Sequence, residues 1–358
     1  MKITEKQLEA ARLLEAALNG DRKAGFMLAE GISTSDLPVQ LTPALNKIAL
    51  AGYDNEPTIW RSFASKETVQ DFGLQEWYGF TGWGDSDVEP ENAGTQFISG
   101  GLPRVPEYGE YSRLRFEATE KSFRLAKSGV AVEFSWELLV DRRNFGLIPS
   151  AFSEFGRRSA ETEDHEATKV LLSNVHFSAQ NGNLATGAAN GPLSIPALEA
   201  AFQQIARQTD QNGNRVRVAS RYALVVPPAL EFTAEQIKAV TSREVIEGVG
   251  TDTETRYVTN GNPVAGKFDV VVNPYLPLLP GGNDTQWYLI PKPGTTPNPT
   301  VVNLFLQGYD RPQIFVKRTT NSDPTEGSFE NDDYETKVRH VVTGEMIVPF
   351  GTLKSAGT

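Results

Sequence analysis

The longest helical pattern in the chain lies between Phe145 and Asn174. Apolar side chains recur there at intervals of three or four residues, with a charged band at 157–166 in the middle. The stripe consists of Ile148, Ala151, Phe152, Phe155, Ala167, Val170 and Leu171. A helix over these residues would be roughly 40 Å long, so one core can cover only part of it. The pattern therefore predicts a spine helix at 145–174 against which the rest of the chain packs.

A second amphipathic pattern begins the chain. Thr4 and Gln7 form a capping box before an apolar stripe, and Gly20 can end the helix, which is predicted at 4–19. Glycines and prolines then interrupt the pattern, so that 21–53 is predicted to be irregular. Residues 1–58 are interpreted as an N-terminal arm that packs on another surface, with an ordinary helix docked on its own chain as the alternative. No uninterrupted apolar run occurs here, and no signal peptide is expected.

The segment 59–125 is rich in glycine and aromatic residues and is predicted to form an extended β-hairpin with flanking strands. A structureless loop of this length would be unusual inside a compact domain. Its tip is acidic, at Asp85, Asp87, Glu89 and Glu91, and Trp77 and Trp83 lie just before it. Such a cluster is often only a solvated face. Exposed tryptophans, however, are normally buried on a partner, so these six residues are candidates for an intermolecular contact.

The remaining pattern alternates strands and helices. Strands are predicted at 113–123 and 130–134, and Ser135 can cap a short helix before the spine helix. Ser194 can cap another helix, and Pro227 and Pro228 end one strand and open a further helix. Later strands are predicted at 221–226, 268–272, 301–306, 313–318, 334–342 and 345–348. We therefore divide the rest of the chain into 126–190 around the spine helix, 191–300 with a compact α/β texture, and 301–358, whose strands return to the spine-helix domain.

Composition narrows the function classes. The chain has 358 residues, a formal net charge of −11 and a pI near 5.0, which argues against broad nucleic-acid binding. It has no cysteine, which excludes disulfides, iron–sulfur clusters and thiolate zinc sites. No run of about 18 apolar residues occurs, so no membrane span is predicted.

The sequence contains no recognisable catalytic, cofactor or metal motif. Only three histidines occur, and the nearest approach to a zinc helix starts at His165. That motif needs a second histidine four residues later, where Lys169 stands, and a di-iron helix needs a glutamate at Thr162. No nucleophile elbow, phosphate loop or dinucleotide fingerprint is present. A hydrolase with dispersed carboxylates remains an alternative, because such pairs come from distant positions.

The order of these parts resembles the major capsid protein of tailed bacteriophages, with the Hong Kong-type capsid fold that encapsulin shells share. The phrases that carry the resemblance are 129–139 (GVAVEFSWELL), 222–230 (YALVVPPAL), 262–275, 304–317 and 334–349. The resemblance implies an α+β fold with an N-terminal arm, an extended loop, a spine helix in a peripheral domain that includes 126–190, and an axial domain at 191–300. The strands at 301–358 would return to the peripheral domain.

The resemblance also implies a structural function without catalysis or cofactors. Copies would form pentamers and hexamers of an icosahedral shell around double-stranded DNA, with the extended loop over a neighbouring subunit. The acidic tip would meet basic residues there, with candidates Arg142, Arg143, Arg157, Arg158, Lys317 and Arg318. Portal, scaffolding or cement proteins would be further partners, and assembly in the cytoplasm of a host bacterium would yield the virion capsid. An encapsulin-like cage for cargo enzymes is the alternative on the same fold.

Overall fold

The computed structural model describes residues 37–83, 105, 107–109, 116–135, 147–209, 215–216, 218–247, 256–317 and 333–358. Several predictions lie outside these ranges, among them the helix at 4–19, the acidic tip from Asp85 to Glu91, and the short helix after Ser135.

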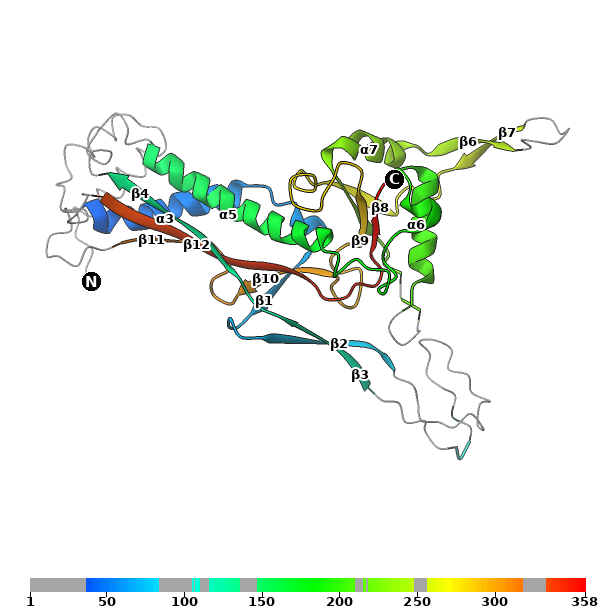
Figure 1. Ribbon diagram of the computed structural model, residues 1–358, viewed down its shortest axis with the longest axis horizontal. Helices are drawn as coiled ribbons and strands as arrows, with labels where there is room; N and C mark the ends of the chain where they lie inside the picture. Colours follow the sequence, from blue (N-terminus) through cyan, green and yellow to red (C-terminus); the bar gives the residue numbers. More distant parts are fainter. Residues whose placement is uncertain are drawn as a thin grey trace.

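A five-stranded sheet runs along the molecule (Figure 1). Its strands are β1 (Ser65–Val69), β4 (Lys127–Ser135), β10 (Val301–Leu306), β11 (Gln313–Val316) and β12 (Asp333–Met346). The long strand β12 pairs antiparallel with β4 and β11 in its first part and with β10 in its second, while β1 lies parallel to β10. The sequence predicted two separate strands where β12 is continuous.

Two helices cover one face of this sheet. Helix α5 (Leu147–Leu172) is the predicted spine helix, and α3 (Leu37–Asn55) lies beside it (Figure 1). The prediction that 21–53 is irregular is wrong from residue 37 onward. Pro38 falls in the first turn of α3, where a missing N–H costs little. Close packing then supports the helix, because Gly156 lies against the backbone of Ala49 and Tyr53, at a spot where a Cβ would overlap the Ala49 carbonyl oxygen.

A four-stranded sheet forms the compact end of the molecule. Its order is β13 (Leu353–Ser355), β9 (Trp287–Pro291), β5 (Tyr222–Val226) and β8 (Phe268–Val272). Around it lie α6 (Ile195–Arg207), α7 (Glu231–Ala239) and the short 3₁₀ helices η3 (Gly187–Asn190) and η4 (Pro228–Leu230). All residues of β5 and β9 are buried. The pairing of β13 with β9 corrects the prediction that all of 301–358 returns to the spine-helix domain.

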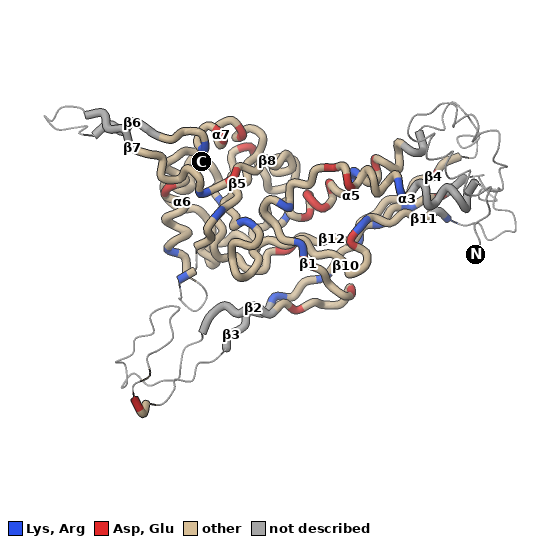
Figure 2. The backbone as a smooth tube through the Cα atoms, turned by 180° about the vertical axis from the view of Figure 1, so that it is seen from behind, with Lys and Arg blue, Asp and Glu red and all other residues tan. Residues whose placement is uncertain are grey.

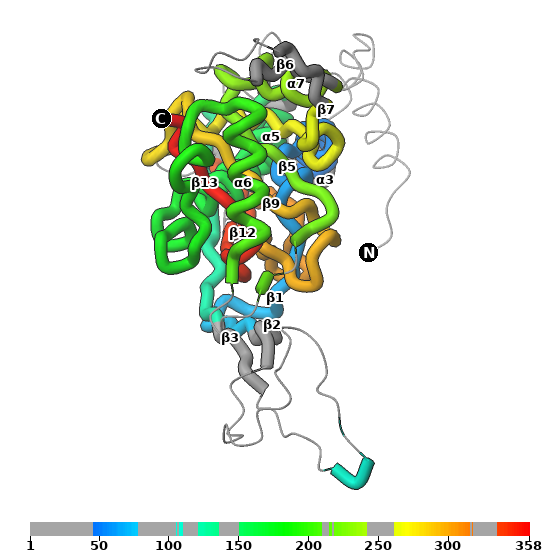
Figure 3. Tube along the Cα trace, turned by 90° about the vertical axis from the view of Figure 1, so that its right-hand side faces the viewer, coloured from blue at the N-terminus to red at the C-terminus, as the bar shows by residue number. Residues whose placement is uncertain are grey.

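Two hairpins extend from the body (Figures 1 and 3). The first, which we call the arm, consists of β2 (Gln75–Trp83) and β3 (Phe116–Phe123), paired antiparallel with an irregularity between Phe80 and Gly82. It leaves from the face of the long sheet opposite to the helices. The second consists of β6 (Ser242–Glu247) and β7 (Arg256–Gly261) and was not predicted. The segment ahead of the arm consists of a 3₁₀ turn, η1 (Trp60–Ser62), followed by β1.

The two sheets share one core through α5. Ala167, Val170 and Leu171 pack in the same cluster as Phe305 of the long sheet and Tyr288 of the four-stranded sheet. A further cluster fills the space between α6, α7 and the four-stranded sheet. A third, on the opposite face of β10 and β12, lies beneath the arm. The C-terminal half of α5 therefore connects the two sheets through buried side chains.

Candidate functional site

A buried carboxylate stands at the centre of the interface between α5 and its neighbours. Glu163 on α5 is completely buried. Its Oε1 accepts a hydrogen bond from the Tyr53 hydroxyl at 2.6 Å, and its Oε2 accepts one from Trp60 Nε1 at 2.9 Å. His340 Nε2 on β12 lies 2.9 Å from Oε1. Glu163 therefore links α3, η1 and β12 to the spine helix, and no lysine or arginine among the described residues pairs with it.

The chemistry of these groups fixes the direction of each bond. Burial, and secondarily the charge of Glu163, raise the pKa of Tyr53 far above its usual value, so the hydroxyl keeps its proton and donates. A carboxylate only accepts, so the contact with His340 requires a hydrogen on Nε2. The other ring nitrogen of His340 is buried without a hydrogen-bond partner in the described structure. Three buried donors therefore converge on the two oxygens of one carboxylate.

The next residue, Asp164, extends the centre toward both sheets. Its Oδ1 accepts from the backbone N–H groups of Ile59 and Trp60 at 2.9 and 2.8 Å, which fixes the start of η1. Burial raises the pKa of Asp164 to about 6, although these two N–H groups oppose the shift. The Asp164 carbonyl accepts from the Thr168 hydroxyl, to which Asn273 after β8 donates at 2.8 Å. We call Glu163, Asp164, Tyr53, Trp60 and His340 the buried carboxylate centre.

The carboxylates of this centre are held by groups of the same chain. Glu163 has three such partners and Asp164 Oδ1 has two, and the described residues contain no group of three or more His, Cys, Asp or Glu side chains that could hold a metal ion. His165, where a zinc motif fails, packs edge-to-face on Tyr275 with ring centroids 4.4 Å apart. Burial lowers the pKa of His165. The centre therefore fixes the position of helices and strands.

The predicted contact residues of the arm divide into two groups. Trp77 is half-buried and packs against the apolar cluster of β10 and β12 in its own chain. Part of the burial of Trp77 therefore comes from its own chain, because the base of the arm lies on the body. Trp83 lies at the end of β2. Asp85, Asp87, Glu89 and Glu91 lie outside the described residues.

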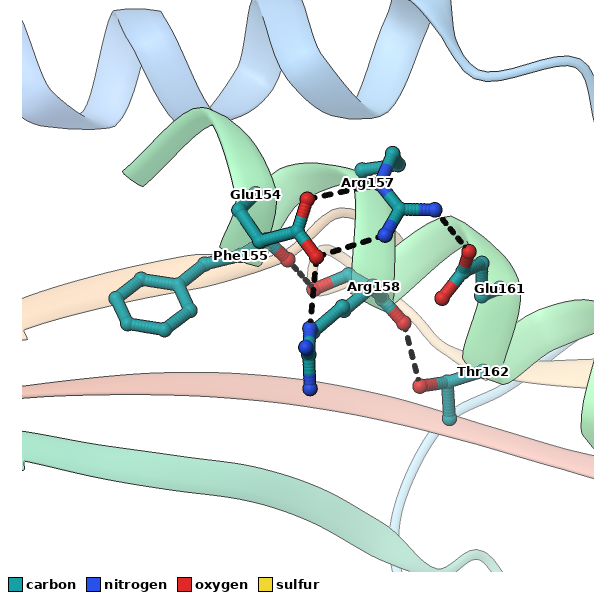
Figure 4. A network of polar contacts seen from close by, with 7 residues as sticks. Glu154, Phe155, Arg157, Arg158, Glu161 and Thr162 are labelled. Carbon is teal, nitrogen blue, oxygen red and sulfur yellow. Dashed lines mark hydrogen bonds and ion pairs between the residues drawn. The ribbon is translucent and has the colours of Figure 1, made fainter. Parts of the chain in front are cut away.

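The predicted basic counterparts already have partners where the structure describes them. Arg157 donates two hydrogen bonds to Glu154, at 2.7 and 2.8 Å, and contacts Glu161, while Arg158 donates to Glu154 at 2.9 Å (Figure 4). Lys317 Nζ lies 2.6 Å from a Glu335 oxygen. Arg142, Arg143 and Arg318 lie outside the described residues. An acidic partner would have to replace Glu154, Glu161 or Glu335 in these ion pairs. The free-energy cost of that replacement is small, because exposed ion pairs are weak.

A second polar cluster, which sequence spacing could not reveal, fastens the arm to the body. Lys121 Nζ on β3 donates to the carbonyl oxygen of Met346 at 2.9 Å and lies 4.0 Å from Glu345 Oε1. His176 Nε2, from the loop after α5, lies 3.3 Å from the same Glu345 oxygen. These residues come from three distant segments, and no motif relates them.

Comparison with known proteins identifies the family and the fold to which this architecture is similar. The family model described as "Phage capsid protein" matches residues 118–354, about two thirds of the chain. The capsid of Ralstonia phage GP4 has a TM-score of 0.51 and 10% identity, over 84% of this chain and 91% of that one, which indicates a shared fold. No curated protein matches the sequence.

Two further solved structures are similar at lower scores. A virus-like particle from Pyrococcus furiosus has a TM-score of 0.45 and 11% identity, over 88% of this chain and 99% of that one. The holo-SrpI encapsulin complex from Synechococcus elongatus has a TM-score of 0.43 and 9% identity, over 82% and 85%. Among the described helices, none combines the length and apolar character that a bilayer span requires. The chain belongs to the phage capsid protein family and is a major capsid protein, the subunit of an icosahedral shell.

Proposed function

We propose that copies of this chain form the pentamers and hexamers of a shell around double-stranded phage DNA, with the arm of each copy lying over a neighbour. The arm carries this proposal. It is a two-stranded ribbon that leaves the body, and among described residues β2 and β3 pair only with each other beyond its base. An isolated two-stranded ribbon is marginally stable in water. A neighbouring copy would supply the surface that it needs.

The edge strand β4 is a suitable receiving surface. None of its nine residues is buried, and of the described strands only β12 pairs with it. Its middle reads Gly-Val-Ala-Val, and Val130 is 49% exposed. A long apolar edge without proline or a bulge readily pairs with another chain. Because β4 and the outer ends of β2 and β3 lie toward different ends of the molecule (Figure 1), a contact between β4 and the arm of a neighbour would be head-to-tail, the type that closes rings.

The distribution of charged residues favours a shell that confines DNA and does not bind it tightly. The chain has 45 acidic and 34 basic residues. In Figure 2, acidic and basic positions are interspersed along α5 and the neighbouring strands. A protein that binds DNA without sequence preference instead gathers its cations on one surface. The acidic tip from Asp85 to Glu91 would exchange into the ion pairs of Arg157, Arg158 or Lys317 on the next subunit.

The same proposal includes the division of the chain. Residues 191–300, with the strand at 353–355 that pairs with β9, form the axial domain. The long sheet and α5 form the peripheral domain. Portal, scaffolding or cement proteins would complete the particle, and assembly would take place in the cytoplasm of a host bacterium.

Electron microscopy of the protein expressed alone, with light scattering alongside, tests this function. Uniform shells, or rings of five and six, are expected. A charge on the β4 edge, Val130→Lys, should prevent assembly without unfolding the subunit. The matched control is Val175→Lys, in the loop after α5, where the valine is 80% exposed. Normal shells from Val130→Lys would remove β4 from the contact. The contents of shells purified from the natural host separate the two alternatives. Shells that hold an enzyme and no DNA would favour the encapsulin-like cage.

A further inference from the structure

We propose that Lys121, Glu345 and His176 form a latch that seats the arm on the body at neutral pH and releases it when His176 takes up a proton. The proposal rests on the proposed function only in giving the arm a role between subunits. The latch itself is a property of one chain.

The first part of the latch is the contact between β3 and the end of β12. Lys121 reaches the Met346 carbonyl and the Glu345 carboxylate, as described above. In the arm, Lys121 is directly opposite Trp77, so both side chains point to the same face of the ribbon. Trp77 packs on the apolar cluster below. Movement of Lys121 away from β12 would therefore also uncover Trp77.

The second part is His176. Its side chain is only 12% exposed, and its Nδ1 is buried without a partner in the described structure. Its backbone carbonyl is held by the side chains of Asn181 and Asn183 at 3.0 and 2.9 Å, so the loop is fixed. Neutral His176 can donate from Nε2 to Glu345. A proton on Nδ1 would have no acceptor while the arm is seated.

The charged neighbours set the direction of the response. Among described residues, the groups that face His176 are Lys121 from β3 and Glu345 from β12, while β10 places Val302 opposite Glu345. Burial first, and then the charge of Lys121, lower the pKa of His176 to about 4, and they outweigh the attraction of the Glu345 carboxylate 3.3 Å away, which favours the protonated ring. A histidine in water titrates near 6.5. A state in which Lys121 has left and water has entered would therefore bind a proton more tightly, so acid favours the open arm.

Glu345 acts in the opposite direction. Burial raises its pKa, with Lys121 and a backbone N–H opposing the shift, so the seated arm keeps a Glu345 proton more readily than the open arm. The Glu345 effect begins only as the pH approaches the pKa of the Glu345 carboxyl group. The His176 effect acts from about pH 6.5 downward. With a His176 pKa of about 4 in the seated arm and about 6.5 in the open arm, the equilibrium constant for arm opening should rise roughly tenfold when the pH falls from 7.5 to 5.5.

Quenching of Trp77 by acrylamide measures arm opening directly. The Trp77 contribution is obtained by difference from Trp77→Phe, below the protein concentration at which light scattering detects particles. With the open arm a minor species at both pH values, the quenchable fraction should increase about tenfold from pH 7.5 to 5.5. His176→Gln keeps a donor for Glu345 but cannot titrate, so it should abolish the increase. The control is His165→Gln, another partly buried histidine, on the spine helix against Tyr275, and it should leave the increase unchanged.

A second variant keeps the proposal testable if His176→Gln does not fold. Lys121→Met removes the bond to Met346 and should make Trp77 fully quenchable already at pH 7.5. The latch is refuted if wild-type Trp77 responds equally at both pH values, or if His176→Gln responds like wild type. Shells that form normally while Trp77 stays unresponsive would overturn the latch alone. A pH-responsive Trp77 in a protein that never forms shells would overturn the proposed function alone.

Discussion

Replacement of Glu163 by leucine should be among the most destabilising single changes in the chain. Leucine nearly preserves the volume, so the change removes the acceptor without opening a large cavity. Tyr53, Trp60 and His340 would each keep a buried donor without a partner, since their exposed fractions are 8%, 2% and 3%. An unsatisfied buried donor costs roughly 1–3 kcal/mol.

The three costs will not add fully, because the Tyr53 hydroxyl can rotate, and removal of the buried charge recovers some desolvation energy. We expect a loss of about 4 kcal/mol in the free energy of unfolding. Glu163→Gln should lose less stability, because its amide oxygen still accepts a hydrogen bond. It should still be less stable than wild type, because its NH₂ group faces one of the three donors.

Urea unfolding of the unassembled subunit, at fixed protein concentration, measures the loss. The matched control is Glu161→Leu, two residues away on α5, where Glu161 pairs with the exposed Arg157. That variant should remain close to wild type because exposed pairs contribute little. If Glu163→Leu and Glu161→Leu unfold at the same urea concentration, the buried carboxylate centre does not stabilise the fold and the reasoning fails.

Three further outcomes are expected. Because the folded-state pKa of Asp164 is raised from 3.8 to about 6, its stabilising contribution is present below pH 3.8 and lost as the pH rises through 6. Asp164→Asn should therefore raise stability at pH 7.5 by roughly 1–3 kcal/mol but not at pH 3.5, in urea titrations at both values. Gly156→Ala should lower the thermal midpoint clearly, since its Cβ would overlap the Ala49 carbonyl, whereas Gly191→Ala, with its nearest neighbour at 3.5 Å, should not. Ser194→Ala should cost about 1 kcal/mol in urea unfolding through loss of the α6 cap, and an unchanged midpoint would contradict that cap.

Local pattern predicted those elements whose periodicity and boundary residues agree. Helix α5 lies within two residues of its predicted bounds, and α6 begins after the predicted cap, Ser194. Strands β8 and β10 have the predicted bounds. Each of these combines a strong apolar pattern with a clear start or end signal.

The failures have a common cause in long-range packing. Helix α3 contains Pro43 and forms against α5, and β9 is hidden in a stretch rich in proline and glycine, yet is completely buried between β13 and β5. The buried carboxylate centre could not be predicted, because the partners of Glu163 lie 103, 110 and 177 residues away. No spacing rule reaches across such separations. Only the fold brings these polar groups together.

The core that α5 shares with both sheets has a mechanical consequence. A load applied to the four-stranded sheet passes through Ala167, Val170 and Leu171 into the long sheet, because these side chains are packed against both. Close-packed interiors have low compressibility and transmit strain. The two sheets should therefore move as one stiff unit along the long axis. When a closed shell is stretched or compressed, deformation should concentrate in the two-stranded hairpins, where no such core resists it.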